Sequence, residues 1–346
     1  MAVSRWRACR GLVAVLALGV LGAGSCRGGC SRGTPGTRPV GGALAWFPAE
    51  TQIVVALDFA RLRTTPLWSR LAALTRSNPD DQALIDEITR RTGFDPLRQI
   101  DSLVVAFPEE ARNGGAMGLV LRGHGLDEAR LVAYARDQAA KQGDDLFSFG
   151  RDGRTLWATR KQPTAAGFFA DDKTFVFGAG GWAEKMAELG SGAGRGAEQN
   201  ASLVHLVERA GVTNAVWAAA IVPAATRALL AADPALASGG GINRLALGID
   251  MTSGLHAQLI ADLSTRQQAE AMAVQVTEVI KDAKKSPQVL LMGMGPYLEG
   301  IQARAIDVTS EIVIQLTDAQ VADGIERLRA FLTLARQAPV PGFPHP

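Results

Sequence analysis

Two hydrophobic patterns alternate along the chain, short apolar runs of strand length and longer stretches with an apolar residue every three or four positions. They are clearest between residues 242 and 280. Ile242–Asp250 and Leu255–Leu263 are apolar runs that predict two strands, and Gly254 between them can take the positive φ of a tight turn. Ser264 and Gln267 then match a capping box at the start of a helix. The stretch therefore predicts a hairpin followed by a helix.

The same unit recurs along the chain. Leu263–Glu270 matches Leu316–Asp323 almost position for position, and each segment follows a predicted strand pair. Residues 101–141 show a third hairpin followed by a helix. We therefore predict a duplicated unit of the size of one domain, with repeats at 43–190 and 197–337 separated by a glycine-rich break.

Antiparallel hairpins that each lead into a helix predict an α+β fold. We expect the helices to pack on one face of the sheets, because a sheet of hairpins has one apolar face to cover. The pattern leaves open whether the repeats form two sheets or join into one.

The N-terminal segment has the pattern of an export signal. A positive stretch at residues 4–10 precedes 14 mostly apolar residues, 11–24, which is short for a membrane span. Small residues directly before Cys26 resemble a bacterial lipoprotein signal, so we predict a signal peptide at 1–25 and a lipid on Cys26. The alternative is ordinary secretion, with cleavage near Ala23 or Ser25.

The segments that flank the body are predicted to be disordered. Residues 26–42 form a tether of Gly, Ser, Thr, Pro and Arg, and 338–346 form a proline-rich tail. Arg27 follows Cys26, and by resemblance to enterobacterial sorting the absence of Asp there favours the outer membrane. We expect a membrane-anchored protein that faces the periplasm or the cell surface, with a soluble periplasmic or secreted protein as the alternative.

Net charge and cysteine content exclude several kinds of partner and site. Without the three arginines of the signal segment the chain has 33 basic and 34 acidic residues, a net charge of −1. Nucleic-acid binding requires clustered positive charge, so we expect none. The three cysteines, Cys9, Cys26 and Cys30, all precede the body, which excludes a disulfide framework or a thiolate metal site there.

Catalytic patterns are weak throughout the body. His124, His205 and His256 are far apart in the sequence, and no His/carboxylate spacing suggests a metal site. Residues 177–183 contain G-x-G-x-x-A, the dinucleotide pattern, but an antiparallel meander is predicted around it instead of a βαβ unit. We therefore predict no catalytic residue, no metal and no cofactor.

Protein binding or scaffolding in the envelope, without enzymatic activity, is the first hypothesis, and a periplasmic carrier of an apolar ligand or lipid is the second. Arg61 and Arg63, on the first helix of the body, are candidates for an anionic partner, although a solvated helix face is the simpler interpretation. Trp68 and Trp182 are candidates for an exposed aromatic patch. An unrecognised enzyme is the third hypothesis.

One resemblance extends over residues 43–140. It rests on Trp46-Phe-Pro48, Val54-Val-Ala-Leu-Asp58, Gly93-Phe-Asp-Pro96, Ile100-Asp-Ser-Leu-Val104 and Leu121-Arg-Gly123. These motifs are similar to those of uncharacterised exported proteins and lipoproteins of myxobacteria and related Gram-negative bacteria, some assigned to a domain of unknown function. The resemblance implies export, and it implies no activity, substrate or catalytic residue.

Replacing Cys26 with Ala tests the anchor. Each buried CH₂ of an acyl chain contributes about 0.8 kcal/mol to membrane binding, so loss of the lipid should release the chain from membranes while the body stays folded. Fractionation of the envelope, with circular dichroism as the control for folding, measures this. A Cys26→Ala chain that remains in the membrane fraction would show that the anchor lies elsewhere.

Overall fold

The computed structural model describes residues 42, 44–76, 78–109, 115–232, 240–291 and 293–337. Cys26, the signal segment, the tether before residue 42 and the tail from residue 338 lie outside the described residues. The strands are β1 (Thr51–Asp58), β2 (Ile100–Pro108), β3 (Met117–Gly123), β4 (Leu146–Arg151), β5 (Arg154–Thr159), β6 (Gln162–Asp171), β7 (Thr174–Ala179), β8 (Val216–Ile221), β9 (Ile242–Asp250), β10 (Leu255–Leu263), β11 (Ile301–Ile306) and β12 (Thr309–Leu316).

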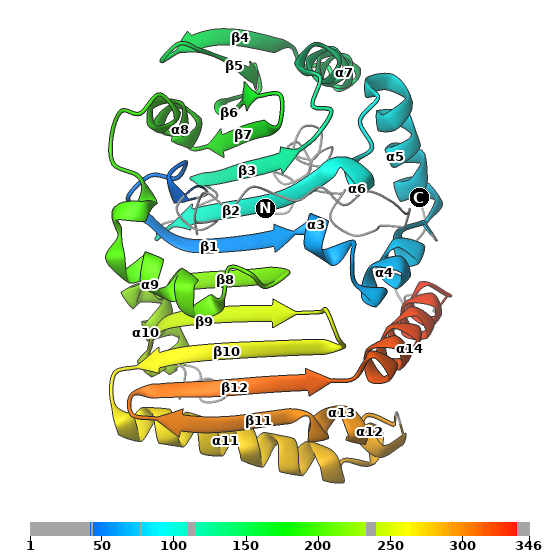
Figure 1. The fold of residues 1–346 in the computed structure, drawn as a ribbon, viewed down its shortest axis with the longest axis vertical. Helices are drawn as coiled ribbons and strands as arrows, with labels where there is room; N and C mark the ends of the chain where they lie inside the picture. The colour runs from blue at the N-terminus through cyan, green and yellow to red at the C-terminus, as the bar shows by residue number, and fades with distance from the viewer. Residues whose placement is uncertain are drawn as a thin grey trace.

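All these strands belong to one antiparallel sheet of twelve in the described part of the chain (Figure 1). Its order is β11-β12-β10-β9-β8-β1-β2-β3-β7-β6-β5-β4. The predicted α+β class with antiparallel strands is therefore confirmed. The question of one sheet or two is also answered, because β1 pairs with β8 across the middle.

The strand order runs in the same way outward from the β1–β8 pair. Strands of residues 43–190 follow as β1-β2-β3-β7-β6, and strands of residues 197–337 follow as β8-β9-β10-β12-β11. The first segment continues with β5 and β4. A duplication would produce this order, and the duplication itself stays a prediction.

Helices connect the strands and cover parts of the sheet. They are α3 (Phe59–Leu62), α4 (Pro66–Arg76), α5 (Pro79–Thr92), α6 (Pro96–Gln99), α7 (Glu128–Lys141), α8 (Trp182–Gly190), α9 (Ala201–Ala210), α10 (Ala224–Ala232), α11 (Arg266–Lys285), α12 (Pro287–Leu291), α13 (Gly295–Glu299) and α14 (Asp318–Gln337).

Both faces of the sheet carry helices, so the expectation of helices on a single face is wrong. Figure 1 shows α9 in front of β8 and α11 behind β11, and we call the two surfaces the α9 face and the α11 face. Trp182 and Met186 of α8 and Leu206 of α9 pack on Val54 and Val120, on the α9 face. The opposite core joins Phe59 of α3 and Trp68 of α4 to Leu103, Leu121 and Phe177.

The strands that lie between both sets of helices explain why the sequence did not reveal that both faces are covered. Residues 174–178 of β7 are all buried, with Val176 in the core below α8 and Phe175 and Phe177 in the core on the other face. A strand buried on both faces has a continuous apolar run without alternation, and such a run does not reveal how many faces are covered.

The helix caps differ from the prediction by one residue at α11. Thr265, not Ser264, accepts the Gln268 backbone N–H, and Gln268 completes the capping box. Ser264 instead uses its hydroxyl in hydrogen bonds with Asn243 and the Gly241 carbonyl. At α14 the reciprocal pair forms between Thr317 and Gln320, the residues that align with the predicted Ser264 and Gln267.

The hairpin of β9 and β10 forms as predicted, with Gly254 at φ 82°. A Cβ at this position would lie 2.1 Å from the Leu316 carbonyl oxygen, so β12 also requires glycine here. The edge strand β4 was missed by the sequence analysis, although Asp152-Gly153 after it is a strong hairpin signal.

Gly178, in β7, should tolerate no side chain. A Cβ there would lie 2.2 Å from the backbone nitrogen of Ala183, so α8 packs directly on the strand. We expect Gly178→Ala to lower the free energy of unfolding by about 1 to 3 kcal/mol, since overpacking displaces backbone. Urea denaturation measures the change.

Gly115→Ala is the matched control, because a Cβ at Gly115 would meet no atom within 4 Å. This variant should change stability by less than about 0.5 kcal/mol. Equal stability of the two variants would contradict the close packing of α8 on β7.

Candidate functional site

The central part of the α11 face carries two rows of aliphatic side chains that cross six strands. Register places neighbouring residues of each row directly opposite one another on adjacent strands. We name this surface the aliphatic floor. Its first row is Val55, Ala218, Leu247, Leu259, Ile312 and Ala303, and its second row is Leu57, Val216, Ile249, Ala257, Ile314 and Ile301.

The aliphatic floor is covered only in part. Ala257 is buried, at 7% exposed, and the other residues of both rows are partly exposed. Strands lie 4.7 to 4.9 Å apart, so a row across six strands is about 24 Å long. The floor contains no charged, polar or aromatic residue, and its surface is uniformly apolar over that length.

Cores bound the floor at two margins. Leu57 of the floor packs against the core built by α3 and α4. At the other margin Ala269 and Met272 of α11 pack with Ala261 and Leu245, which lie next to the floor on β10 and β9. α11 also lies behind β11, so it covers part of the floor at that end, and the rest of the floor lies between the two helix-covered regions.

The opposite face of β10, β12 and β11 is largely polar, whereas that of β1, β8 and β9 lies in the core on the α9 face. On β10, His256 is exposed and Gln258 is partly exposed, and they alternate with Ala257 and Leu259 of the floor. Arg304 of β11 is exposed on this α9 face. The end of the sheet formed by β10, β12 and β11 is thus amphipathic, with a solvated polar face and an apolar face that water should not wet.

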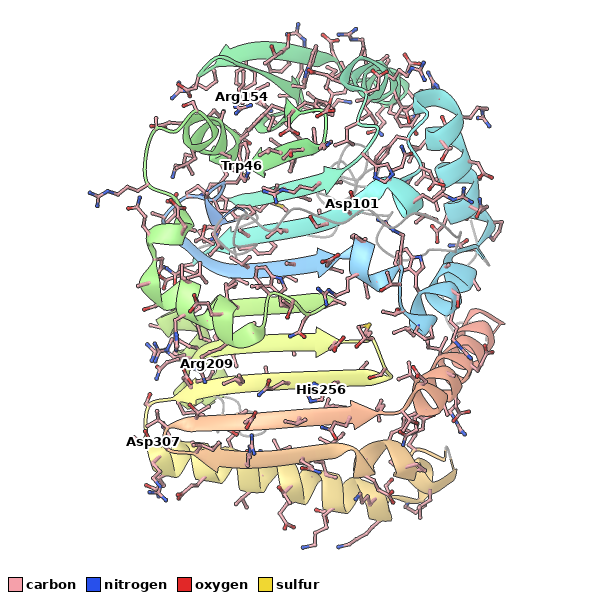
Figure 2. All side chains as sticks on the ribbon, in the orientation of Figure 1. Trp46, Asp101, Arg154, Arg209, His256 and Asp307 are labelled. Atoms are coloured by element: carbon pink, nitrogen blue, oxygen red, sulfur yellow. The ribbon has the colours of Figure 1, made fainter. Side chains whose placement is uncertain are left out.

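Asp262 holds the polar face together at one end of β10. Its side chain is 6% exposed and accepts two hydrogen bonds of 2.8 Å from Arg209 of α9. Arg244 of β9 lies 3.2 Å away, and Thr309 of β12 donates at 2.9 Å. Figure 2 labels Arg209 near this end of the sheet and His256 toward the other end. The network joins α9 to three strands, and all its groups have partners, so its role is structural.

Glu311 of β12 forms a second polar contact on this face. Hydrogen bonds from Arg304 and Gln258 hold the pKa of the Glu311 carboxyl below its ordinary value, although burial of the group opposes the shift. Arg304 is exposed, so this ion pair also lies at the surface of the sheet.

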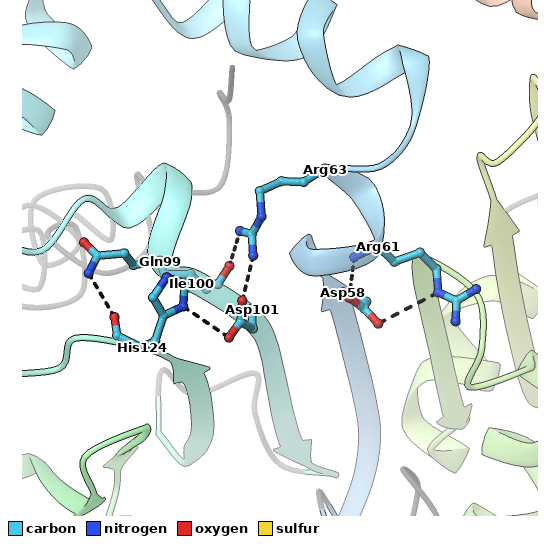
Figure 3. A network of polar contacts seen from close by, with 7 residues as sticks. All are labelled: Asp58, Arg61, Arg63, Gln99, Ile100, Asp101 and His124. Carbon is cyan, nitrogen blue, oxygen red and sulfur yellow. Dashed lines mark hydrogen bonds and ion pairs between the residues drawn. The ribbon is translucent and has the colours of Figure 1, made fainter. Parts of the chain in front are cut away.

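A histidine and a carboxylate meet near the end of β2, where Figure 3 shows the polar contacts. His124 Nδ1 lies 3.5 Å from Asp101 Oδ2, and Arg63 donates to Asp101 Oδ1 at 2.6 Å and to the Ile100 carbonyl at 2.6 Å. His124 and Asp101 are 58% and 42% exposed, and among the described residues no hydroxyl group hydrogen-bonds to the ring. A triad needs a nucleophile within hydrogen-bond reach of the base, so the cluster has the geometry of a surface ion pair.

The structure corrects the predicted partner surface. Trp68 and Trp182 are 4% and 2% exposed and belong to the cores under α4 and α8, so neither can form an exposed aromatic patch. Arg61 lies 3.9 Å from Asp58, and Arg63 binds Asp101. The two arginines thus contact separate carboxylates and do not form a single anion-binding site.

The histidines and the glycine-rich pattern of the sequence do not come together in a site. His124, His205 and His256 lie on a bend, on α9 and on β10, and the described residues contain no group of three His, Cys, Asp or Glu that could hold a metal. The glycine pattern before α8 joins antiparallel β7 to a helix, without the parallel strand of a dinucleotide site. Among the helices of the described part, none has the length and apolar character required to cross a membrane.

The aliphatic floor itself was missed by the sequence analysis. Its residues occupy alternate positions of six strands, and an apolar strand residue does not by itself show whether a helix covers it. Partial exposure depends on which strands are neighbours, and the β1–β8 pairing that extends the floor links residues of the two predicted repeats. The alternation in β10 of Gln258 with Leu259 was the available signal.

Comparisons with known proteins assign no family. No family model matches the chain, and no curated protein matches it. Among solved structures, crystal form III of TP0453 aligns with a TM-score of 0.47 at 10% identity, over 82% of this chain and 97% of that chain. Crystal form I of TP0453 aligns with a TM-score of 0.42 at 11% identity, over 84% and 96%. Likenesses at this distance identify neither family nor function.

Glu311 makes the stability of the sheet sensitive to acid. Its folded pKa is lowered, so its contribution is present above the unfolded value of about 4.3 and is lost as the pH falls through the folded pKa. We expect Glu311→Gln to be less stable than the wild type at neutral pH and to lose less stability on acidification. Urea denaturation at neutral and at acidic pH measures both, and parallel losses for the two proteins would contradict the ion pair.

Proposed function

We propose that this chain is a non-enzymatic protein of the bacterial cell envelope that acts by binding, and that the aliphatic floor is its binding surface. The proposal places the body outside the cytoplasm, held to a membrane by a lipid on Cys26. Its main support is the partly exposed, uniformly aliphatic face that crosses six strands. The resemblance to exported lipoproteins is a second, independent support.

The composition of the floor favours an aliphatic ligand over a folded protein. Protein interfaces concentrate their binding energy in Trp, Tyr and Arg, and the floor has none of these. Val, Leu, Ile and Ala offer only dispersion contacts and removal of water, which suit a lipid acyl chain. Of the two binding roles considered, carrier and scaffold, the carrier therefore agrees better with this surface.

The energy available is sufficient for a long-chain lipid. Burial of one CH₂ contributes about 0.8 kcal/mol, so ten methylenes on the floor would supply about 8 kcal/mol before the cost of immobilising the ligand. That cost is several kcal/mol, which leaves a reversible complex of the kind a carrier requires.

A binding role also agrees with the polar groups. The buried acidic side chains of the described residues, Asp262 and Glu311, are paired with arginines that hold helix and strands together. Figure 3 shows His124 beside Asp101, and this histidine–carboxylate contact is exposed to solvent and has the geometry of a surface ion pair.

The decisive experiment measures fatty-acid binding to the exported chain that carries Cys26→Ala. A fluorescent long-chain fatty acid should bind in a 1:1 complex, and Leu259→Lys should weaken binding at least tenfold, because a desolvated ammonium on the floor is unfavourable. Native mass spectrometry of wild-type protein extracted gently from its membranes should show one lipid-sized addition.

His256→Lys is the matched control, since His256 lies on the same strand but on the opposite, solvated face. It should leave binding unchanged. A wild-type chain that binds no fatty acid and carries no lipid would refute the carrier. A co-purified polypeptide, lost in Leu259→Lys, would favour the scaffold instead.

A further inference from the structure

β4 is the outermost strand at one end of the sheet, and only one of its edges is paired. Its register with β5 runs from Leu146 opposite Thr159 to Arg151 opposite Arg154. Figure 1 shows no strand or helix beyond β4 at that end. The outer edge is therefore a row of backbone groups available to another strand.

The hairpin geometry identifies the backbone groups of β4 that point outward. Asp152 and Gly153 form a two-residue turn with φ values of 49° and 74°, so Arg151 and Arg154 are a hydrogen-bonded pair. Bonded and non-bonded pairs then alternate, and Phe149 and Phe147 also bond to β5. The N–H and C=O groups that point away from β5 belong to Leu146, Ser148 and Gly150.

Most of that edge is unshielded in the described chain, because Ser148 and Gly150 are exposed, whereas Leu146 is 5% exposed and packs with Val132 and Ala139 of α7. No hydrogen bond there reaches the backbone of Leu146, Ser148 or Gly150. β4 contains no Pro or Lys, its register has no bulge, and its one charged residue, Arg151, lies at the end of the strand, so the middle of the edge lacks a protecting group. The strand at the other end, β11, carries Arg304 and lies against α11.

From this geometry we infer that β4 binds β4 of a second copy of the chain, antiparallel, about a two-fold axis at Ser148. Ser148 then lies opposite Ser148 of the second copy, and Leu146 lies opposite Gly150 in both directions. This register pairs all three outward residues of each strand. If one strand shifts by two residues along the other, some of these outward residues no longer have a hydrogen-bonding partner on the second copy.

The side chains are complementary in the same register. Phe147 lies opposite Phe149 of the second copy, on the face where these rings already lie 6.0 Å apart. A Cβ at Gly150 would meet no atom within 4 Å, so Gly150 offers no steric obstacle to the second copy. Cross-strand aromatic pairs of this kind stabilise a sheet by about 0.2 to 1 kcal/mol each.

Opposite charges meet at both ends of the paired strands. Arg151 lies opposite Asp145 of the second copy, and the symmetry repeats this pair. Arg151 and Asp145 are 55% and 59% exposed, and within one chain they contact Asp152 and Arg160 at the surface. This charge match singles out a second copy over an unrelated extended peptide, because a peptide has no fixed charge at these positions.

The association is independent of the proposed function. The dimer buries the end of the sheet farthest from β10, β11 and β12, which supply half of the floor. Two floors would therefore remain open in one continuous sheet formed from both copies.

Sedimentation velocity of the exported Cys26→Ala chain tests the inference. The protein should be a dimer at tens of micromolar, and Ser148→Pro should raise the dissociation constant at least tenfold, because it deletes two central hydrogen bonds from the symmetric pair. Proline is tolerable at this position since the Ser148 N–H does not bond to β5. Ser148→Ala, which keeps the N–H, should dimerise like the wild type.

A charge exchange gives a second test that does not depend on proline. Arg151→Glu and Asp145→Arg should each weaken the dimer, because each places like charges opposite one another, and the double variant should restore it. A monomeric wild type would overturn the inference. So would a Ser148→Pro dimer as tight as that of Ser148→Ala, or a double variant weaker than both single ones.

Discussion

The main-chain pairing of β1 with β8 is the contact on which the architecture depends. It is the only strand pairing in the described sheet that joins the two halves of the chain, and it sets Val54 opposite Ala219 and Ala56 opposite Trp217. These four side chains lie in the core below α8 and α9. On the other face, the same ladder puts Val55 beside Ala218 and Leu57 beside Val216, which extends the aliphatic floor from β8 onto β1.

The burial and polarity of the two faces of the sheet differ on the two sides of the β1–β8 pair. Toward β7 both faces of the sheet are covered, and five consecutive residues of β7 are buried. Toward β12 one face is held by charged networks around Asp262 and Glu311, and the other is aliphatic. The proposed function rests on this change, along one sheet, from two buried faces to one polar and one aliphatic face. It does not rest on any single residue.

Local features of the fold could be predicted from the sequence, and relations between distant segments could not. The β9–β10 hairpin follows from alternating apolar residues and Gly254, and the helices after β3, β10 and β12 follow from their spacing. The shift of the cap from Ser264 to Thr265 depends on Gly241, which precedes it by a whole hairpin. Trp68 and Trp182 were expected at the surface because a sequence shows the size of a side chain but not what packs over it. The floor depends on strand order, and no local pattern specifies the neighbour of β1.

The distance along the chain between β1 and β8 has a consequence for how the protein folds. A chain synthesised from its N-terminus presents β1, β2 and β3 long before β8 is made. During that interval β1 is an unprotected edge, and Val55 and Leu57 face water. Long-range pairings of this kind close slowly, and exposed edges attract other strands. Folding of this protein should therefore be limited by the arrival of its second half, and the period before that arrival is when it most needs a chaperone.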